Sequence, residues 1–99
     1  MKLYFSPAYC SQAVHIALRE AGIAFDLVQV DTVAGRTAGG DDYRAINPLG
    51  YVPMLELDDG TRHTEVAALL QYVADLAPGS GLVPPGGSRE RFEVLQWLT

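Results

Sequence analysis

The sequence predicts an α/β domain in which helices pack on a small mixed sheet of four strands. Two observations predict this fold class. Strand-like and helical segments follow one another in the order strand–helix–strand, and this unit favours a parallel pair with a right-handed crossover. Further along the chain, two short strand-like runs flank Asp59-Gly60, a dipeptide typical of a tight hairpin turn. This hairpin adds an antiparallel pair.

The first unit begins with a strand at residues 2–5, which a Ser-Pro pair ends. From residue 10 or 11 to residue 21 the apolar side chains recur with helical spacing, and Gly22 is a typical stop signal. The stripe has four members at i, i+3, i+4 and i+7: Val14, Ala17, Leu18 and Ala21. The valine-rich residues 25–31 predict the second strand.

Residues 32–51 are rich in glycine and polar side chains, so we expect a loop with one irregular helical turn near residues 43–46. The hairpin follows, and after it comes the strongest helical pattern of the chain, which Thr64 can cap. Its expected buried stripe consists of Ala67, Leu70, Val73 and Ala74.

The composition changes near residue 78. Residues 78–87 are dominated by proline and glycine, which is typical of a linker, and residues 88–99 predict a new helix with Ser88 as its cap. A helix of about twelve residues is marginal by itself in water, and its apolar stripe needs partners. We therefore expect a first domain at residues 1–77, a linker, and the first helix of a truncated C-terminal helical domain.

Charge and hydropathy exclude several classes of function. The 99 residues carry a net charge of −5, with no basic patch for nucleic acid or for an anionic membrane surface. No apolar run approaches the ~20 residues of a membrane span, and the N-terminus lacks the pattern of a signal peptide. A single cysteine forms no internal disulfide, which favours the reducing cytoplasm. Two histidines and one cysteine show no metal-ligand spacing, so no metal is expected.

Three positions carry candidate chemistry. Cys10 lies where the first helix begins, and unpaired N–H groups and the helix dipole there favour the negative charge of its own or an external thiolate. The alternative is a small buried hydrophobic residue. Val52-Pro53 is either a plain turn before a strand or a cis peptide that exposes its backbone to an extended ligand. Glu65 falls in the first turn of its helix and either caps it or binds a ligand.

Together, "SPAYCS", "INPLGYVPML" and "TEVAALLQYVAD" resemble, in order, the N-terminal domain of glutathione S-transferases, and the bacterial beta class most closely. The resemblance implies a thioredoxin-like fold, glutathione as cosubstrate, and a homodimer of the full-length protein. It also implies a cis bond at Val52-Pro53, preceded by Tyr51, with the backbone of Val52 holding the cysteinyl unit. Glu65 and Val66 would meet the γ-glutamyl end, and Cys10 would face the sulfur.

The chain departs from the family pattern at three positions. Val66 stands where many relatives have a serine whose hydroxyl helps to bind a carboxylate. Gly35 stands where many beta-class members have a lysine that reaches the glycyl carboxylate, and the adjacent Arg36 is the candidate replacement. Tyr51 replaces a residue that is often polar.

The leading function is a cytoplasmic transferase that conjugates the glutathione thiolate to small electrophiles, the chemistry of detoxification. Two alternatives stay open. A monothiol, glutaredoxin-like thiol transferase would work through Cys10, because "CSQA" lacks a second cysteine. A non-catalytic binding or regulatory module would keep the fold without turnover, and Val66 and Gly35 favour it. We expect the pocket for the electrophile to lie mostly in the truncated helical domain, so the isolated chain of residues 1–99 should be poorly active in conjugation.

Overall fold

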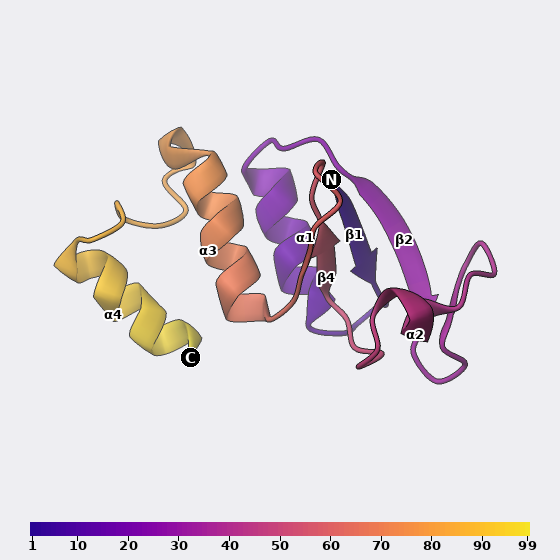
Figure 1. Cartoon of the computed structure of the whole chain (residues 1–99). Coiled ribbons are helices and arrows are strands. Elements are labelled where there is room, and N and C mark those ends of the chain that lie inside the picture. The colour runs from indigo at the N-terminus through magenta and orange to yellow at the C-terminus, as the bar shows by residue number, and fades with distance from the viewer.

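The structure, a computed structural model, describes all residues from Met1 to Thr99. It contains five strands, four α-helices and one short 3-10 helix (Figure 1). In chain order these are β1 (Lys2–Phe5), α1 (Ser11–Glu20), β2 (Asp26–Asp31), β3 (Arg36–Thr37), α2 (Tyr43–Ile46), β4 (Met54–Glu56), β5 (Arg62–His63), α3 (Val66–Leu76), η1 (Pro78–Ser80) and α4 (Arg89–Leu98).

The strands form one mixed sheet in the order β3-β2-β1-β4-β5. Only β1 and β2 are parallel, and α1 is the crossover between them, as the strand–helix–strand pattern predicts. The pairs β1–β4, β2–β3 and β4–β5 are antiparallel. Leu3 at the centre of the sheet pairs with Leu27 on one side and Leu55 on the other.

Two hydrophobic clusters cover the two faces of the sheet because successive strand residues point to opposite sides. Helices α1 and α3 pack side by side on one face (Figure 1). The buried cluster beneath them consists of Leu3, Val14, Leu18, Leu55, Leu69 and Val73. The opposite face carries α2, and its cluster consists of Tyr4, Val30, Tyr43, Val52 and Met54.

The expected count of four strands is wrong, because the structure adds β3 at the edge of the sheet. This strand has two residues, too few for an alternating pattern to be visible in the sequence. Its pairing depends on a tight reversal in which Thr37 accepts the N–H of Asp41 on its hydroxyl and donates its own N–H to the carbonyl of Asp41.

The start of α3 also differs from the prediction. The helix begins at Val66, and the residue at its N-cap is Glu65 rather than Thr64. The backbone of Glu65 has φ +73°, and no side chain caps the helix. The chain therefore enters α3 through a sharp turn at positive φ, which the Thr-Glu pair in the sequence does not predict. Of the expected stripe, Val73 and Ala74 are buried, whereas Ala67 and Leu70 are half-buried and Leu69 is buried instead.

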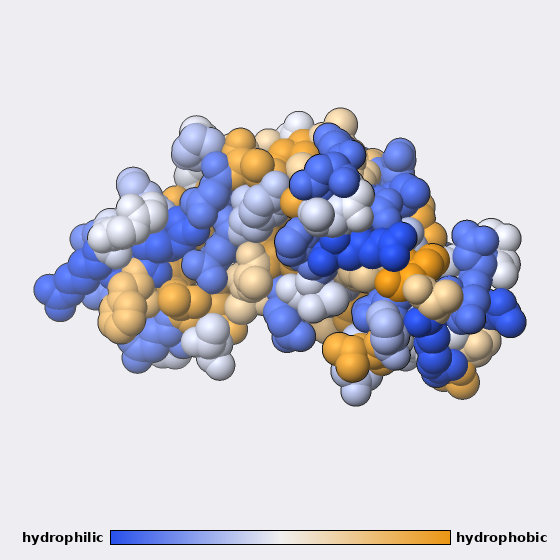
Figure 2. Space-filling view, in the orientation of Figure 1, coloured by the Kyte–Doolittle hydropathy of each residue, from blue (hydrophilic) through white to orange (hydrophobic).

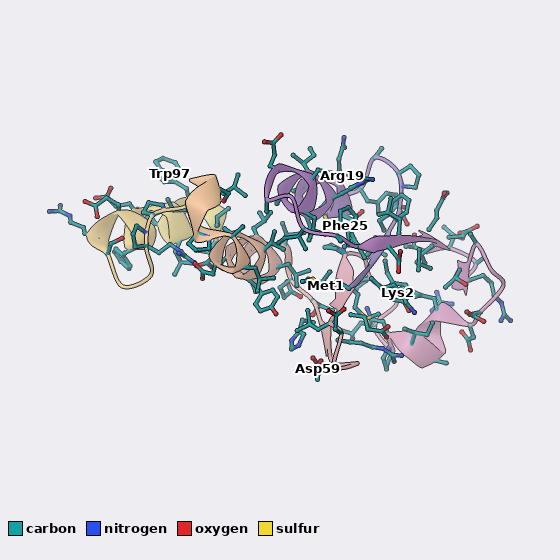
Figure 3. The ribbon with its side chains drawn as sticks, turned by 90° about the horizontal axis from the view of Figure 1, so that it is seen from above. Met1, Lys2, Arg19, Phe25, Asp59 and Trp97 are labelled. Atoms are coloured by element: carbon teal, nitrogen blue, oxygen red, sulfur yellow. The ribbon has the colours of Figure 1, made fainter.

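Helix α4 is joined to α3 through Arg91. Ser88 caps α4 as expected, accepting the N–H of Arg91 at 3.1 Å. The Arg91 guanidinium is buried against α3, where it forms an ion pair with Asp75 at 2.6 Å. Two aromatic residues of α4 face away from α3: Phe92 is exposed and Trp97 projects into solvent (Figure 3). Apolar side chains are visible on this part of the surface (Figure 2).

None of the helices has the length and apolar character that crossing a bilayer requires. No three of the histidine, cysteine, aspartate and glutamate side chains lie close enough together to hold a metal ion.

Candidate functional site

Three loops meet at one end of the strands of the sheet and enclose a groove of about 550 Å³. The first follows β1 and carries Cys10, the second precedes β4 and carries Val52, and the third leads into α3 and carries Glu65. Because β1 and β4 are antiparallel neighbours, the end of one lies beside the beginning of the other. The first turns of α1 and α3 and helix α2 lie at this same end of the strands (Figure 1).

Cys10 is the N-cap residue of α1, and its exposed thiol lines the groove. The thiol donates to the carbonyl oxygen of Val52 at a sulfur–oxygen distance of 3.6 Å. Buried serines fix the loop that carries it. Ser11 accepts the N–H of Ser6 at 3.2 Å and donates to the Ser6 carbonyl at 3.1 Å. The Ser6 hydroxyl donates in turn to the carbonyl of Val30 at 2.6 Å.

The Val52-Pro53 peptide bond is cis. Two side chains of the preceding segment fix the residue before Val52 by hydrogen bonds. The carbonyl of Tyr51 accepts two hydrogen bonds, from the Tyr43 hydroxyl at 2.6 Å and the Asn47 side-chain amide at 2.9 Å. Burial raises the pKa of Tyr43, and the hydrogen bond with Asn47 opposes this only in part. The phenol therefore stays protonated at neutral pH and acts as a donor.

The backbone of Val52 is available to a ligand. Its N–H makes no hydrogen bond within the chain, and its carbonyl accepts only the weak thiol donor of Cys10. A backbone donor and an acceptor on one residue at the head of a strand are the groups that pair with an extended peptide. The groove can therefore accept a peptide in the manner of an added strand.

Glu65 places a free carboxylate at the side of the groove next to α3. Its side chain is exposed, lines the groove, and forms no hydrogen bond or ion pair with the protein. Val66 lies directly behind it as the first residue of α3, where backbone N–H groups have no partner within the helix. An anion acceptor and a cation acceptor are thus adjacent, which suits a ligand group that carries both charges, such as an α-amino acid.

The structure places six of the seven candidate residues around this one groove: Cys10, Tyr51, Val52, Pro53, Glu65 and Val66. Arg36 is the exception. It lies in β3, paired with Asp31 of β2, and does not line the groove. Because β3 is an edge strand, this position belongs to the rim of the sheet rather than to the loops at its end.

Six further residues that were not among the predicted site residues line the groove: Thr32, Arg44, Asn47, Leu49, Gly50 and Thr64. Position is the one signal for most of them, since they lie close to the end of a strand or to the Pro53 turn, whereas Arg44 lies within α2. Tyr9, which precedes the thiol, also lines the groove and accepts a hydrogen bond from Thr32 at 3.3 Å.

The comparisons with known proteins all indicate the same family. The sequence profile described as the N-terminal domain of glutathione S-transferase matches residues 7–76. A curated protein named glutathione S-transferase GstA, from Escherichia coli O157:H7, is 50% identical over 98 residues, which is 99% of this chain and 49% of that protein.

Solved structures agree in fold. A ternary complex of BphK, a bacterial GST, superposes with a TM-score of 0.96 at 58% identity, covering 99% of this chain and 49% of that one. A sphingomonad glutathione S-transferase complexed with glutathione superposes with a TM-score of 0.95 at 49% identity, with the same two coverages. The chain spans about half the length of the relatives it matches.

Proposed function

Because the chain belongs to the glutathione S-transferase family through its N-terminal domain, we propose that it binds glutathione in the groove between Cys10, Val52 and Glu65. The observation that supports this proposal most directly is the backbone of Val52. Its N–H is unpaired, and its carbonyl accepts a hydrogen bond only from the thiol of Cys10. Glutathione is a short, extended peptide with a thiol at its centre. The backbone of its cysteinyl unit pairs with Val52, which brings its sulfur beside Cys10.

The γ-glutamyl end of glutathione carries an ammonium and a carboxylate on one carbon. The Glu65 carboxylate binds the ammonium, and the N–H groups at the start of α3, including that of Val66, bind the carboxylate. Val66 has no hydroxyl to add a further hydrogen bond, and one such bond is worth about 0.5–1.5 kcal/mol. The backbone amides and the dipole of α3 therefore bind the γ-glutamyl carboxylate without help from a side-chain hydroxyl.

The proposed reaction is conjugation of glutathione to a small electrophile. The glutathione thiol loses its proton to solvent, and the thiolate attacks an electrophilic carbon. A carbon–sulfur bond forms while the electron pair leaves with a departing group or moves onto an acceptor within the electrophile. The dipole at the start of α1 and the thiol hydrogen of Cys10 stabilise the attacking thiolate before the bond forms.

One observation favours a second activity at the same groove, thiol transfer. Cys10 is exposed and is the only cysteine, so it can exchange with a mixed disulfide without being trapped in an internal bond. Its thiolate attacks the glutathionyl sulfur of the mixed disulfide and releases the substrate thiolate. A free glutathione thiolate then attacks the Cys10 mixed disulfide, which restores Cys10 and forms glutathione disulfide.

We also propose that the full-length protein is a cytoplasmic homodimer. The single unpaired cysteine fits a reducing compartment. Exposed aromatic side chains at Tyr72, Phe92 and Trp97 offer apolar surface that association would cover. Sedimentation of the protein over a range of concentrations tests the dimer directly.

Calorimetric titration with glutathione, followed by a conjugation assay with chlorodinitrobenzene, tests the proposed function. We expect saturable binding with one site per chain, and slow product formation that stops when glutathione is omitted. Binding without product in either a conjugation or a thiol-exchange assay supports the non-catalytic module instead. Absence of binding at millimolar glutathione contradicts the proposal altogether.

A further inference from the structure

The C-terminal end of α2 is held by an arginine from an edge strand of the sheet. Ile46 is the last residue of this helix, and its carbonyl has no partner within the helix. Arg62 of β5 donates an N–H of its guanidinium to this carbonyl at 3.3 Å. The other end of α2 is tied near the opposite edge, where the N–H of Tyr43 donates to the carbonyl of Gly35, the residue before β3, at 2.9 Å.

A carboxylate on the neighbouring strand fixes this arginine. Glu56 of β4 lies directly opposite Arg62 in the β4–β5 ladder, and Nε of Arg62 donates to Oε1 of Glu56 at 2.8 Å. This hydrogen bond is the largest cause that lowers the pKa of Glu56, so the carboxylate is charged at neutral pH. Lys2 lies 3.5 Å from the second oxygen of the same carboxylate but makes no hydrogen bond to α2. The Arg62 guanidinium alone therefore joins the hairpin to the end of the helix.

The residue that follows the end of α2 fixes the backbone of the groove. Asn47 is buried, and its side-chain amide donates to the carbonyl of Tyr51 at 2.9 Å. This carbonyl and the N–H of Val52 belong to one trans peptide unit, which is planar, so the two bonds point in opposite directions. A carbonyl held by Asn47 therefore turns the N–H of Val52 away from α2 and leaves it free for a ligand in the groove that Val52 lines.

We propose that Arg62, held by Glu56, is a positioning residue for the groove. By fixing the carbonyl at the end of α2 it fixes Asn47, and through Asn47 the direction of the Val52 N–H that pairs with the peptide ligand. Neither Arg62 nor Glu56 lines the groove, so their effect on binding is indirect. The ligand is glutathione, and the inference therefore rests on the proposed function.

The test compares two variants that each remove one cation from beside Glu56. In calorimetric titrations, Arg62→Met should bind glutathione about threefold or more weakly than the unmodified chain, because the direction of the Val52 N–H is no longer fixed. Lys2→Met is the matched control, since it removes the same charge from the same carboxylate, and it should leave the affinity unchanged. In the ligand-free chain, the nuclear magnetic resonance signal of the Val52 amide should shift in Arg62→Met and stay in place in Lys2→Met. A loss of overall stability would not produce this signature.

Glu56→Gln is the second variant, because it weakens the anchor of Arg62 without removing the arginine. It should lower the affinity for glutathione by a smaller factor, and it takes the place of Arg62→Met if circular dichroism shows that variant to be unfolded. Unchanged affinity in the variant that decides, or an equal loss in Lys2→Met, overturns the inference while leaving the proposed function intact. Failure of the unmodified chain to bind glutathione contradicts the proposed function and this inference with it.

Discussion

The sulfur of Cys10 lies 3.6 Å from the carbonyl oxygen of Val52, across 42 positions of the sequence. This contact joins the start of α1 to the turn before β4, and it brings the only thiol of the chain beside a backbone position that has an unpaired N–H. A ligand that pairs with Val52 must therefore pass the thiol. A peptide thiol that pairs with the backbone of Val52 would therefore have its sulfur close to the sulfur of Cys10.

Replacing Cys10 with alanine should separate binding from thiol exchange. The thiol is a weak hydrogen-bond donor, so glutathione affinity should fall by less than about tenfold. The mixed disulfide between chain and glutathione should disappear completely, as measured by intact mass after exposure to glutathione disulfide. Cys10→Ser, which keeps a hydroxyl donor, is the control and should also form no adduct. A Cys10→Ala chain that no longer binds glutathione would show that the thiol itself holds the ligand.

Tyr43→Phe should loosen the segment that presents Val52. The substitution removes the hydrogen bond to the Tyr51 carbonyl and should lower the free energy of unfolding by about 1 kcal/mol. Glutathione affinity should fall a few-fold as well, as measured by urea unfolding and calorimetry. Tyr4→Phe is the matched control, because Tyr4 is also buried in the same cluster but its hydroxyl makes no hydrogen bond. Equal effects of the two substitutions would argue against a role for the Tyr51 contact.

Glu65→Gly should stabilise the fold while it weakens ligand binding. Glu65 has φ +73° with ψ 115°, a sparsely populated conformation that costs a non-glycine residue about 1–3 kcal/mol and costs glycine less. Urea unfolding should therefore show a gain of about 1 kcal/mol, and calorimetry a loss of about tenfold or more in glutathione affinity. Glu65→Gln should lose affinity without gaining stability. Unchanged affinity in both variants would remove Glu65 from the site.

The contact between α3 and α4 should weaken in acid. The hydrogen-bonded Arg91 guanidinium lowers the pKa of Asp75 below its ordinary value of 3.8, so the ion pair contributes stability above that value and loses it as the pH falls through the lower folded pKa. Trp97 is the only tryptophan and lies on α4, so its fluorescence anisotropy should fall in the same window as the helix gains mobility.

Asp75→Asn provides the comparison for this experiment. Its anisotropy should already be low near neutral pH and should change little on acidification. Circular dichroism identifies the pH range in which the rest of the fold persists. An acid transition of equal size in the variant would assign the effect to other groups.

The longer elements could be predicted from the sequence because each has its own periodic signal. Helix α1 was expected near residues 11–21 and spans Ser11–Glu20, and the single turn at Tyr43–Ile46 was located correctly. The hairpin around Asp59-Gly60 is confirmed, with Leu57 donating to the Thr61 carbonyl at 2.8 Å. In these cases local propensity and tertiary structure favour the same conformation.

Features that depend on tertiary placement could not be predicted in the same way. Strand β3 depends on the reversal of the chain at Thr37, and Glu65 has its positive φ at the junction between β5 and α3. The Arg44 side chain, which lines the groove, lies against Gly35 and Gly50. Residues 35, 44 and 50 form no motif, so the sequence directed attention to Arg36, the charge next to the glycine.

The structure of this chain in complex with glutathione tests the central claim most directly. We predict an extended tripeptide whose cysteinyl N–H and C=O pair with Val52, whose sulfur lies beside Cys10, and whose ammonium contacts Glu65. Glutathione bound elsewhere on the molecule, or a groove filled by the protein's own side chains while the ligand is absent at saturating concentration, would contradict it.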